Sequence, residues 1–236
     1  MKAWEYHNQI IRRRKINQAR EAVRMRETAV IDQSAEQQPE FDLLLEAVKQ
    51  DREKLHGIPQ GPERNERKRE LVKNYLPAVE AYLAGEKKFR NPVLSQVMIW
   101  LFDLGDIDQA MRLARVAVEQ NQPMPDGFKR DIRTGVADLV LDWVNTRENQ
   151  PVEPYFSEIY ALIFPAEGIG WQIHDDIKIK YIKIAIARAE AEQDVRKALQ
   201  LCKFAESIDP KKAQVKTRKA QLEKAVAKLD EAAKYQ

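Results

Sequence analysis

The stretch that decides the fold occupies residues 91–125 and reads NPVLSQVMIWLFDLGDIDQAMRLARVAVEQNQPMP. Residues 93–104 are apolar almost all the way round, and a helix with no polar face is buried on every side. From Ile107 onward, apolar and polar residues follow the spacing of an amphipathic helix. Between these segments stand Gly105, a residue that commonly ends a helix, and Asp106, a residue that caps the next one. The stretch therefore predicts two helices joined by a very tight turn.

Length and composition are those of a helical globular protein. Of 236 residues, 44% are hydrophobic and 33% are charged, with both signs mixed. This balance supplies a core and argues against intrinsic disorder. The chain has only 8 glycines, few for the tight turns of a β-meander. We predict an all-α fold of helical hairpins.

The flanking segments contain further helical patterns. We predict helices at residues 41–55, 63–82, 128–145, 155–164, 171–191 and 195–208. Pro77 is expected to break or kink its helix, because proline lacks the amide hydrogen that a helix interior uses. Asp209 and Pro210 are expected to open a long C-terminal helix. Its apolar residues follow coiled-coil spacing: Val215, Leu222, Val226, Leu229 and Ala233.

We expect three parts along the chain. Residues 1–39 form a basic N-terminal helix and linker that is the candidate DNA-binding segment. Residues 40–150 form a central helical domain that holds the stretch quoted above. Residues 151–236 form a C-terminal helical hairpin followed by a basic terminal helix.

The central stretch has a counterpart 88 residues further on. When the sequence is aligned with itself at this offset, Asp106 matches Asp194, Ala110 matches Ala198, and similar residues match after them. This pattern predicts a tetratricopeptide-like hairpin used twice. The alternative is that any two packed helices with an Asp cap look alike.

Charge is concentrated at the two ends. Residues 1–26 carry eight Lys or Arg against two acids, which is +6, and residues 211–236 carry eight against three, which is +5. The segment between them is −8, since the whole chain is +3. Basic ends on an acidic body favour contact with a polyanion.

The N-terminal cations are the predicted contacts with DNA. Few acids stand near them, and such a group can neutralise phosphates and release counterions. The alternative is a solvated helix. The candidate DNA-binding residues are Arg12, Arg13, Arg14, Lys15, Arg20, Arg24 and Arg26.

No catalytic, metal or cofactor site is predicted. The three histidines are far apart and lack a cysteine partner, and no glycine-rich phosphate loop of the P-loop type is present. Asp103, Asp106 and Asp108 are close enough in sequence to suggest a metal-dependent nuclease. Helix capping explains these acids at least as well.

Cysteine content and hydropathy indicate the protein's cellular environment. The single cysteine, Cys202, excludes an intrachain disulfide and is expected in the core. No apolar run approaches the roughly 18 residues of a membrane span, and no signal core precedes the first basic cluster. We expect a reducing compartment and no membrane contact.

The sequence VMIWLFDLGDIDQAMRLARVAV followed by PMP resembles the signature of the small terminase subunit of cos-packaging tailed phages, often labelled the terminase endonuclease subunit. The resemblance covers residues 71–223. It implies a subunit that recognises the packaging site on concatemeric double-stranded DNA and assembles as a ring-like homo-oligomer. It also implies a partner, the large terminase subunit, which supplies the ATPase and nuclease. No helix-turn-helix is identifiable, so base-specific recognition is left open.

Two other functions remain open at this point. One is a helical-repeat interaction scaffold without DNA binding, which the paired hairpins and the C-terminal apolar spacing favour. The other is a metal-dependent DNA endonuclease that uses Asp103, Asp106 and Asp108.

Overall fold

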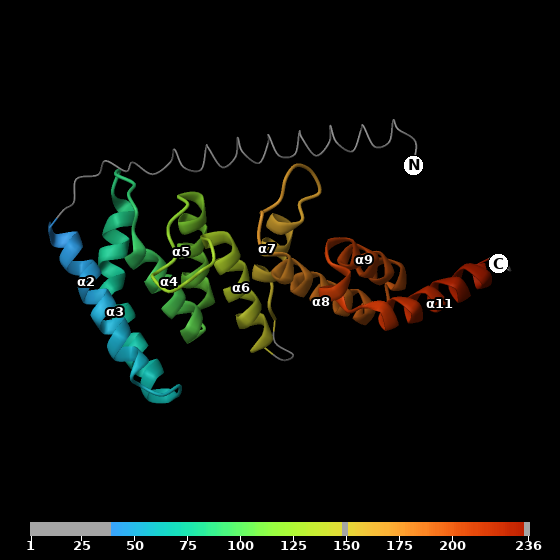
Figure 1. Cartoon of the computed structure of the whole chain (residues 1–236), viewed down its shortest axis with the longest axis horizontal. Helices are drawn as coiled ribbons and strands as arrows, with labels where there is room; N and C mark the ends of the chain where they lie inside the picture. The colour runs from blue at the N-terminus through green and yellow to red at the C-terminus, as the bar shows by residue number, and fades with distance from the viewer. Residues whose placement is uncertain (1–38, 148–150, 234–236) are drawn as a thin grey trace. The chain divides into compact units, whose positions relative to one another are not determined.

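A computed structural model describes residues 39–147 and 151–233 (Figure 1). These residues form helices and connecting turns and contain no strand, which confirms the all-α prediction. They divide between two compact units, one that ends at Ile132 and one that begins at Arg133. The ten helices of the described ranges are α2 Pro39–His56, α3 Pro62–Ala84, α4 Pro92–Leu104, α5 Ile107–Glu119, α6 Ile132–Asn145, α7 Tyr155–Ile163, α8 Asp175–Ala191, α9 Val195–Ile208, α10 Pro210–Ala213 and α11 Lys216–Ala233.

None of the described helices combines the length and the apolar character that crossing a membrane requires.

The first unit is built around α4. Ten consecutive residues, Val93 to Phe102, are buried, and helices α2, α3 and α5 pack against this helix. Trp100 is only 2% exposed. A fully buried side chain of this kind contributes about 1.5–3 kcal/mol, so the helix without a polar face is the centre of the hydrophobic core.

Both ends of α4 have the predicted capping residues. The Asn91 side chain accepts a hydrogen bond from the Leu94 amide at 3.1 Å, and Pro92 is the first helical residue. Gly105 adopts the left-handed conformation, with φ 76°, which costs a residue with a side chain about 1–2 kcal/mol. Asp106 then caps α5 by accepting from the Gln109 amide. The predicted tight turn is confirmed.

The predicted break at Pro77 is wrong, while the alternative, a kink, stays a prediction. Helix α3 runs from Pro62 to Ala84 with Pro77 inside it. Tyr75, Val79 and Tyr82 are buried on either side of the proline, and the Tyr75 hydroxyl donates to Asp51 of α2 at 2.8 Å. These contacts offset the roughly 3 kcal/mol that an interior proline costs.

Two predicted helix starts are also too early. Helix α6 begins at Ile132 and not at residue 128, because Phe128 instead closes a turn onto the Pro125 carbonyl. Helix α8 begins at Asp175 and not at residue 171, because the Trp171 amide donates to the Leu162 carbonyl. In each segment, a backbone amide donates a hydrogen bond to a carbonyl outside the helix that follows.

The C-terminal helix is interrupted near its start. Asp209 and Pro210 open the single turn of α10, as a cap and a first residue, but Gln214 then adopts a left-handed conformation. Helix α11 starts afresh at Lys216. The prediction of one long helix from residue 209 was therefore wrong in its first turn.

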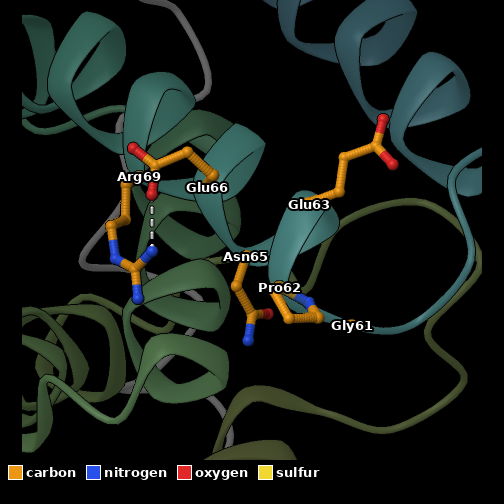
Figure 2. A pocket seen from close by; sticks show the side chains of 6 residues that line it. All are labelled: Gly61, Pro62, Glu63, Asn65, Glu66 and Arg69. Atoms are coloured by element: carbon orange, nitrogen blue, oxygen red, sulfur yellow. Dashed lines mark hydrogen bonds and ion pairs between the residues drawn. The ribbon is translucent and has the colours of Figure 1, made fainter.

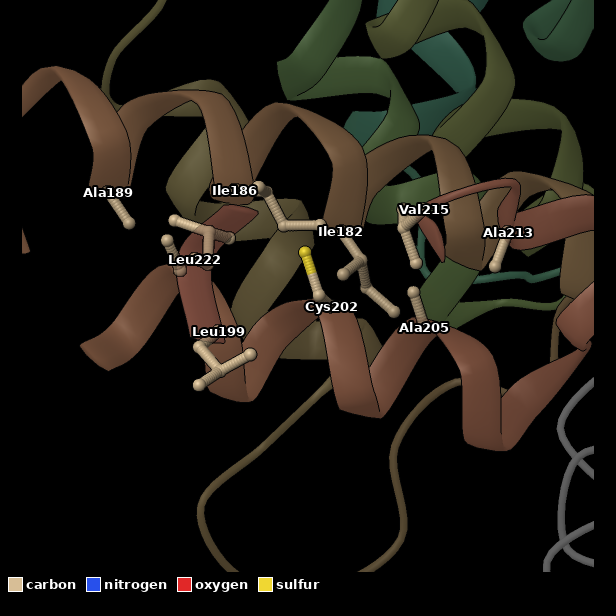
Figure 3. Packing of buried hydrophobic residues seen from close by; sticks show 10 residues of the cluster. Ile182, Ile186, Ala189, Leu199, Cys202, Ala205, Ala213, Val215 and Leu222 are labelled. Carbon is tan, nitrogen blue, oxygen red and sulfur yellow. The ribbon is translucent and has the colours of Figure 1, made fainter. Parts of the chain in front are cut away.

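One cluster of buried residues in the second unit lies where α8, α9, α10 and α11 meet (Figure 3). Cys202 lies in this cluster, fully buried, as the sequence predicts. The first three residues of the predicted coiled-coil pattern lie in or against this cluster. Val215 and Leu222 are buried in the cluster, and Val226 packs against it. Leu229 is 49% exposed.

The two predicted hairpins have the same local geometry. Gly105 (φ 76°) and Gln193 (φ 60°) are both left-handed. The caps that follow, Asp106 (φ −79°, ψ 72°) and Asp194 (φ −83°, ψ 75°), each accept from the amide three residues on. The sequence match is therefore also a match of backbone conformation. Tetratricopeptide-like packing itself stays a prediction.

Replacing Asp106 tests the contribution of this cap. Asp106→Ala is expected to lower the free energy of unfolding by about 1 kcal/mol, because it removes the side-chain acceptor at the start of α5. Asp106→Asn keeps an acceptor and should lose much less. Chemical denaturation of the three proteins measures both changes. Equal losses in the two variants would show that the cap is not what Asp106 contributes.

Candidate nucleic-acid interface

The seven cations predicted to contact DNA lie outside the described residues. Arg12, Arg13, Arg14, Lys15, Arg20, Arg24 and Arg26 all belong to residues 1–38. Their role stays a prediction from sequence. The described residues can still test the nuclease hypothesis and show which other charged side chains form ion pairs.

Two of the three predicted nuclease acids, Asp103 and Asp106, take part in contacts within the first unit. Asp103 forms an ion pair with Lys68 at 2.8 Å, and the Lys68 side chain is only 6% exposed. Asp106 caps α5 and also accepts from the Gln109 side chain at 2.8 Å. Within the described ranges, no group of three or more His, Cys, Asp or Glu is placed to hold a metal ion. The described geometry accounts for Asp103 and Asp106 as structural residues.

A buried polar network lies beside this hairpin. The Tyr82 hydroxyl donates to the Gln120 side chain at 2.6 Å and accepts from Gln122 at 2.8 Å. Gln122 also donates to the Phe89 carbonyl and accepts from the Asn91 amide. Burial raises the pKa of Tyr82. The network joins the end of α3, residues 85–91 and the end of α5, so it positions backbone and offers no free reactive group.

A shallow surface pocket of about 610 Å³ lies at the start of α3 (Figure 2). Two of its lining residues, Arg69 and Glu66, form an ion pair at 2.7 Å (Figure 2). Gly61, Pro62, Glu63 and Asn65 also line it. The lining residues include no nucleophile beside a base, which is the arrangement that covalent catalysis requires. The pocket therefore indicates no reaction.

The cations of α3 and α5 are mostly matched by acids. Arg67 pairs with Glu70 at 2.7 Å, as Arg69 does with Glu66. Arg112 forms two hydrogen bonds with Glu80, and this contact raises the pKa of Arg112. Apart from Lys68, the charged run at the start of α3 is thus largely a solvated face.

The ion pair between Lys68 and Asp103 was not predicted from the sequence. Lys68 stands in the run ERNERKRE, where every charged residue looks solvated, and only the packing of α3 on α4 buries its side chain. No local signal distinguishes it from its neighbours. The pair is a product of tertiary structure.

The described ranges define an all-helical protein that contains helical hairpins. A family model described as phage small terminase subunit matches residues 45–168, more than half of the chain. The chain therefore belongs to the phage small terminase subunit family, as the resemblance of its central hairpin predicted.

Two curated relatives agree. A protein of Haemophilus phage HP1 named "Probable terminase, endonuclease subunit" is 34% identical over 119 residues, which is 50% of this chain and 41% of the relative. One of Escherichia phage P2 named "Terminase, endonuclease subunit" is 31% identical over 90 residues, which is 38% of this chain and 36% of the relative. The chain thus spans well under half the length of each relative. No solved structure matches.

If Asp103 has a structural role, replacing it should destabilise the protein. Asp103→Ala should lower the free energy of unfolding by roughly 1–3 kcal/mol, because Lys68 would stay buried without its carboxylate. Lys68→Met combined with Asp103→Ala should recover most of that loss. Denaturant titration measures both. An Asp103→Ala protein of unchanged stability that had lost Mg²⁺-dependent DNA nicking would instead assign this residue to catalysis.

Proposed function

We propose that this chain is the small terminase subunit that binds the cos packaging site on concatemeric phage DNA. It delivers that DNA to the large subunit, which supplies ATPase and nuclease activity, in the host cytoplasm. The observation that carries this proposal is the family match over residues 45–168, which contains the whole α4–α5 hairpin. The +6 charge of residues 1–26 supplies a segment suited to phosphates.

The names of the two relatives raise the question of where cleavage occurs. Both relatives are called endonuclease subunits, which favours the nuclease as the second candidate function. On this chain we assign cleavage to the complex with the large subunit, because Lys68 pairs with Asp103 and Asp106 caps a helix. A nicking assay with Mg²⁺ or Mn²⁺ on the purified chain separates the two.

We also propose a ring-like homo-oligomer, with α11 as a contact between copies. Leu222 and Val226 of its apolar seam pack inside the second unit. Leu229, one turn beyond Val226, is 49% exposed. A seam that continues past its own core offers an apolar strip to another helix.

The N-terminal cations are tested by the salt dependence of DNA affinity. Changing Arg12, Arg13, Arg14 and Lys15 to Gln should weaken binding to a packaging-site duplex. The slope of log affinity against log salt should fall by as much as about 3 to 4, since each neutralised phosphate contributes roughly 0.9. Fluorescence anisotropy across a salt series measures this slope.

A matched control is available on α3. Arg67→Gln with Arg69→Gln removes two cations that already pair with Glu70 and Glu66, so it should change the slope little. A wild-type chain that binds the large subunit but no DNA at low salt would support the scaffold alternative. An N-terminal variant with an unchanged slope would place DNA binding elsewhere on the chain.

The seam is tested by substituting its exposed leucine. Leu229→Glu should shift the assembly to a smaller species in light scattering, because a charge in an apolar contact is desolvated without a partner. Leu43→Glu is the control, since Leu43 of α2 is 72% exposed and lies outside the seam. The same mass for both variants and the wild type would exclude Leu229 from the contact.

A further inference from the structure

The turn between α9 and α11 gathers several exposed cations. The Asp209 carboxylate accepts hydrogen bonds from the backbone amides of Lys211 and Lys212, at 2.8 and 3.1 Å. These bonds hold α10 as a single turn, and the left-handed Gln214 reverses the chain before α11. We call residues 209–216, together with Lys183 of α8, the lysine turn.

The turn is anchored by its apolar residues, so its lysines face outward. Ala213 and Val215 are buried with Ile182 and Ala205 in the core of the second unit (Figure 3). Lys211, Lys212 and Lys216 alternate with these anchors and are exposed. The shape of the turn therefore does not depend on the lysine side chains, and their ammonium groups are free to bind a ligand.

A fourth cation joins from a different helix. The Lys183 ammonium donates to the Lys212 carbonyl at 3.3 Å, which fixes it beside α10. Within residues 39–147 and 151–233, no ion pair links an acid to any of these four lysines. The nearby Glu206 pairs with Lys219 instead.

Asp209 is the one carboxylate in the turn, and its charge is already engaged. The backbone amide of Lys212 is the main cause that lowers its pKa, with the charges of Lys212 and Lys211 acting in the same direction. The turn with Lys183 thus carries four cations against one hydrogen-bonded anion, a net charge of +3.

The chemistry of the turn fits a phosphate backbone better than a protein surface. The core of a protein interface is apolar and aromatic, whereas the exposed residues of this turn are three lysines, Gln214 and Pro210. Its other apolar residues, Ala213 and Val215, face the core. Lysine is a compact point charge on a flexible stem, suited to phosphates that need no fixed orientation. Phosphate contacts carry no base information, so no reading element is required beside them.

We propose that the lysine turn is a second DNA contact, in which Lys183, Lys211, Lys212 and Lys216 neutralise backbone phosphates independently of base sequence. The proposal rests on the proposed function. It adds a contact in the second unit to the N-terminal one. A single chain would then hold DNA both near its start and near residue 210.

The test uses the full-length chain and a duplex of random sequence. Lys211→Gln with Lys212→Gln should lower the slope of log affinity against log salt by about 2, at roughly 0.9 for each lost phosphate contact. Lys224→Gln with Lys228→Gln is the matched control. It removes the same charge from exposed positions of α11 outside the turn, and it should change the slope by much less.

The possible results are distinct. A wild-type chain that binds DNA, with an unchanged slope for the Lys211 and Lys212 variant, overturns the lysine turn and leaves the proposed function standing. An equal fall in the control variant also overturns it, since the effect would then be one of general charge. A wild-type chain that binds no DNA overturns both. Loss of large-subunit binding with an unchanged DNA slope would assign the turn to a protein partner.

A measurement on the unaltered protein removes any dependence on how the variants fold. Acetylation of lysines, read by mass spectrometry with and without the duplex, should show Lys211, Lys212 and Lys216 protected by DNA. Lys224 and Lys228 should react equally in both samples. Equal modification of all five lysines in the presence of DNA would overturn the proposal.

Discussion

The first unit depends on the complete burial of α4. Residues 93–102 present no polar face, so the helix is stable only if other helices cover it on every side. Helices α2, α3 and α5 do so, and the proline inside α3 is tolerated because its neighbours are held in the same core. The burial of Lys68 has the same origin, since the approach of α3 to α4 takes its side chain out of water and requires Asp103 as partner.

The ends of the hairpin are fixed by local chemistry. Gly105 supplies a left-handed residue and Asp106 supplies an acceptor, so the chain reverses within two residues. The second unit repeats this solution with Gln193 and Asp194, although Gln pays the left-handed penalty that Gly avoids. In both hairpins, small residues on the second helix are buried and permit close approach. Local signals set the turns, and long-range packing sets which faces are hidden.

This division explains what could be predicted from the sequence. Caps, the tight turn and the burial of Cys202 were predictable, because each depends on residues within one or two helical turns. The continuity of α3 at Pro77 and the late start of α8 were not, because they depend on contacts with Asp51 and Leu162, which belong to other helices. For the candidate site, the excess of C-terminal cations was visible in composition. Their gathering around α10 was not, because Lys183 comes from another helix.

The separation of packing from charge also bears on function. The residues that identify the family lie in and around the hairpin, where they are buried or engaged with one another. The net positive charge lies toward the two ends of the chain, outside the segment that the family model matches. Phosphate binding needs exposed cations and few apolar contacts, whereas a core needs the reverse. A protein that must do both places them in different segments. In the proposed function, the hairpin would hold the adjoining helices in place and would not itself contact DNA.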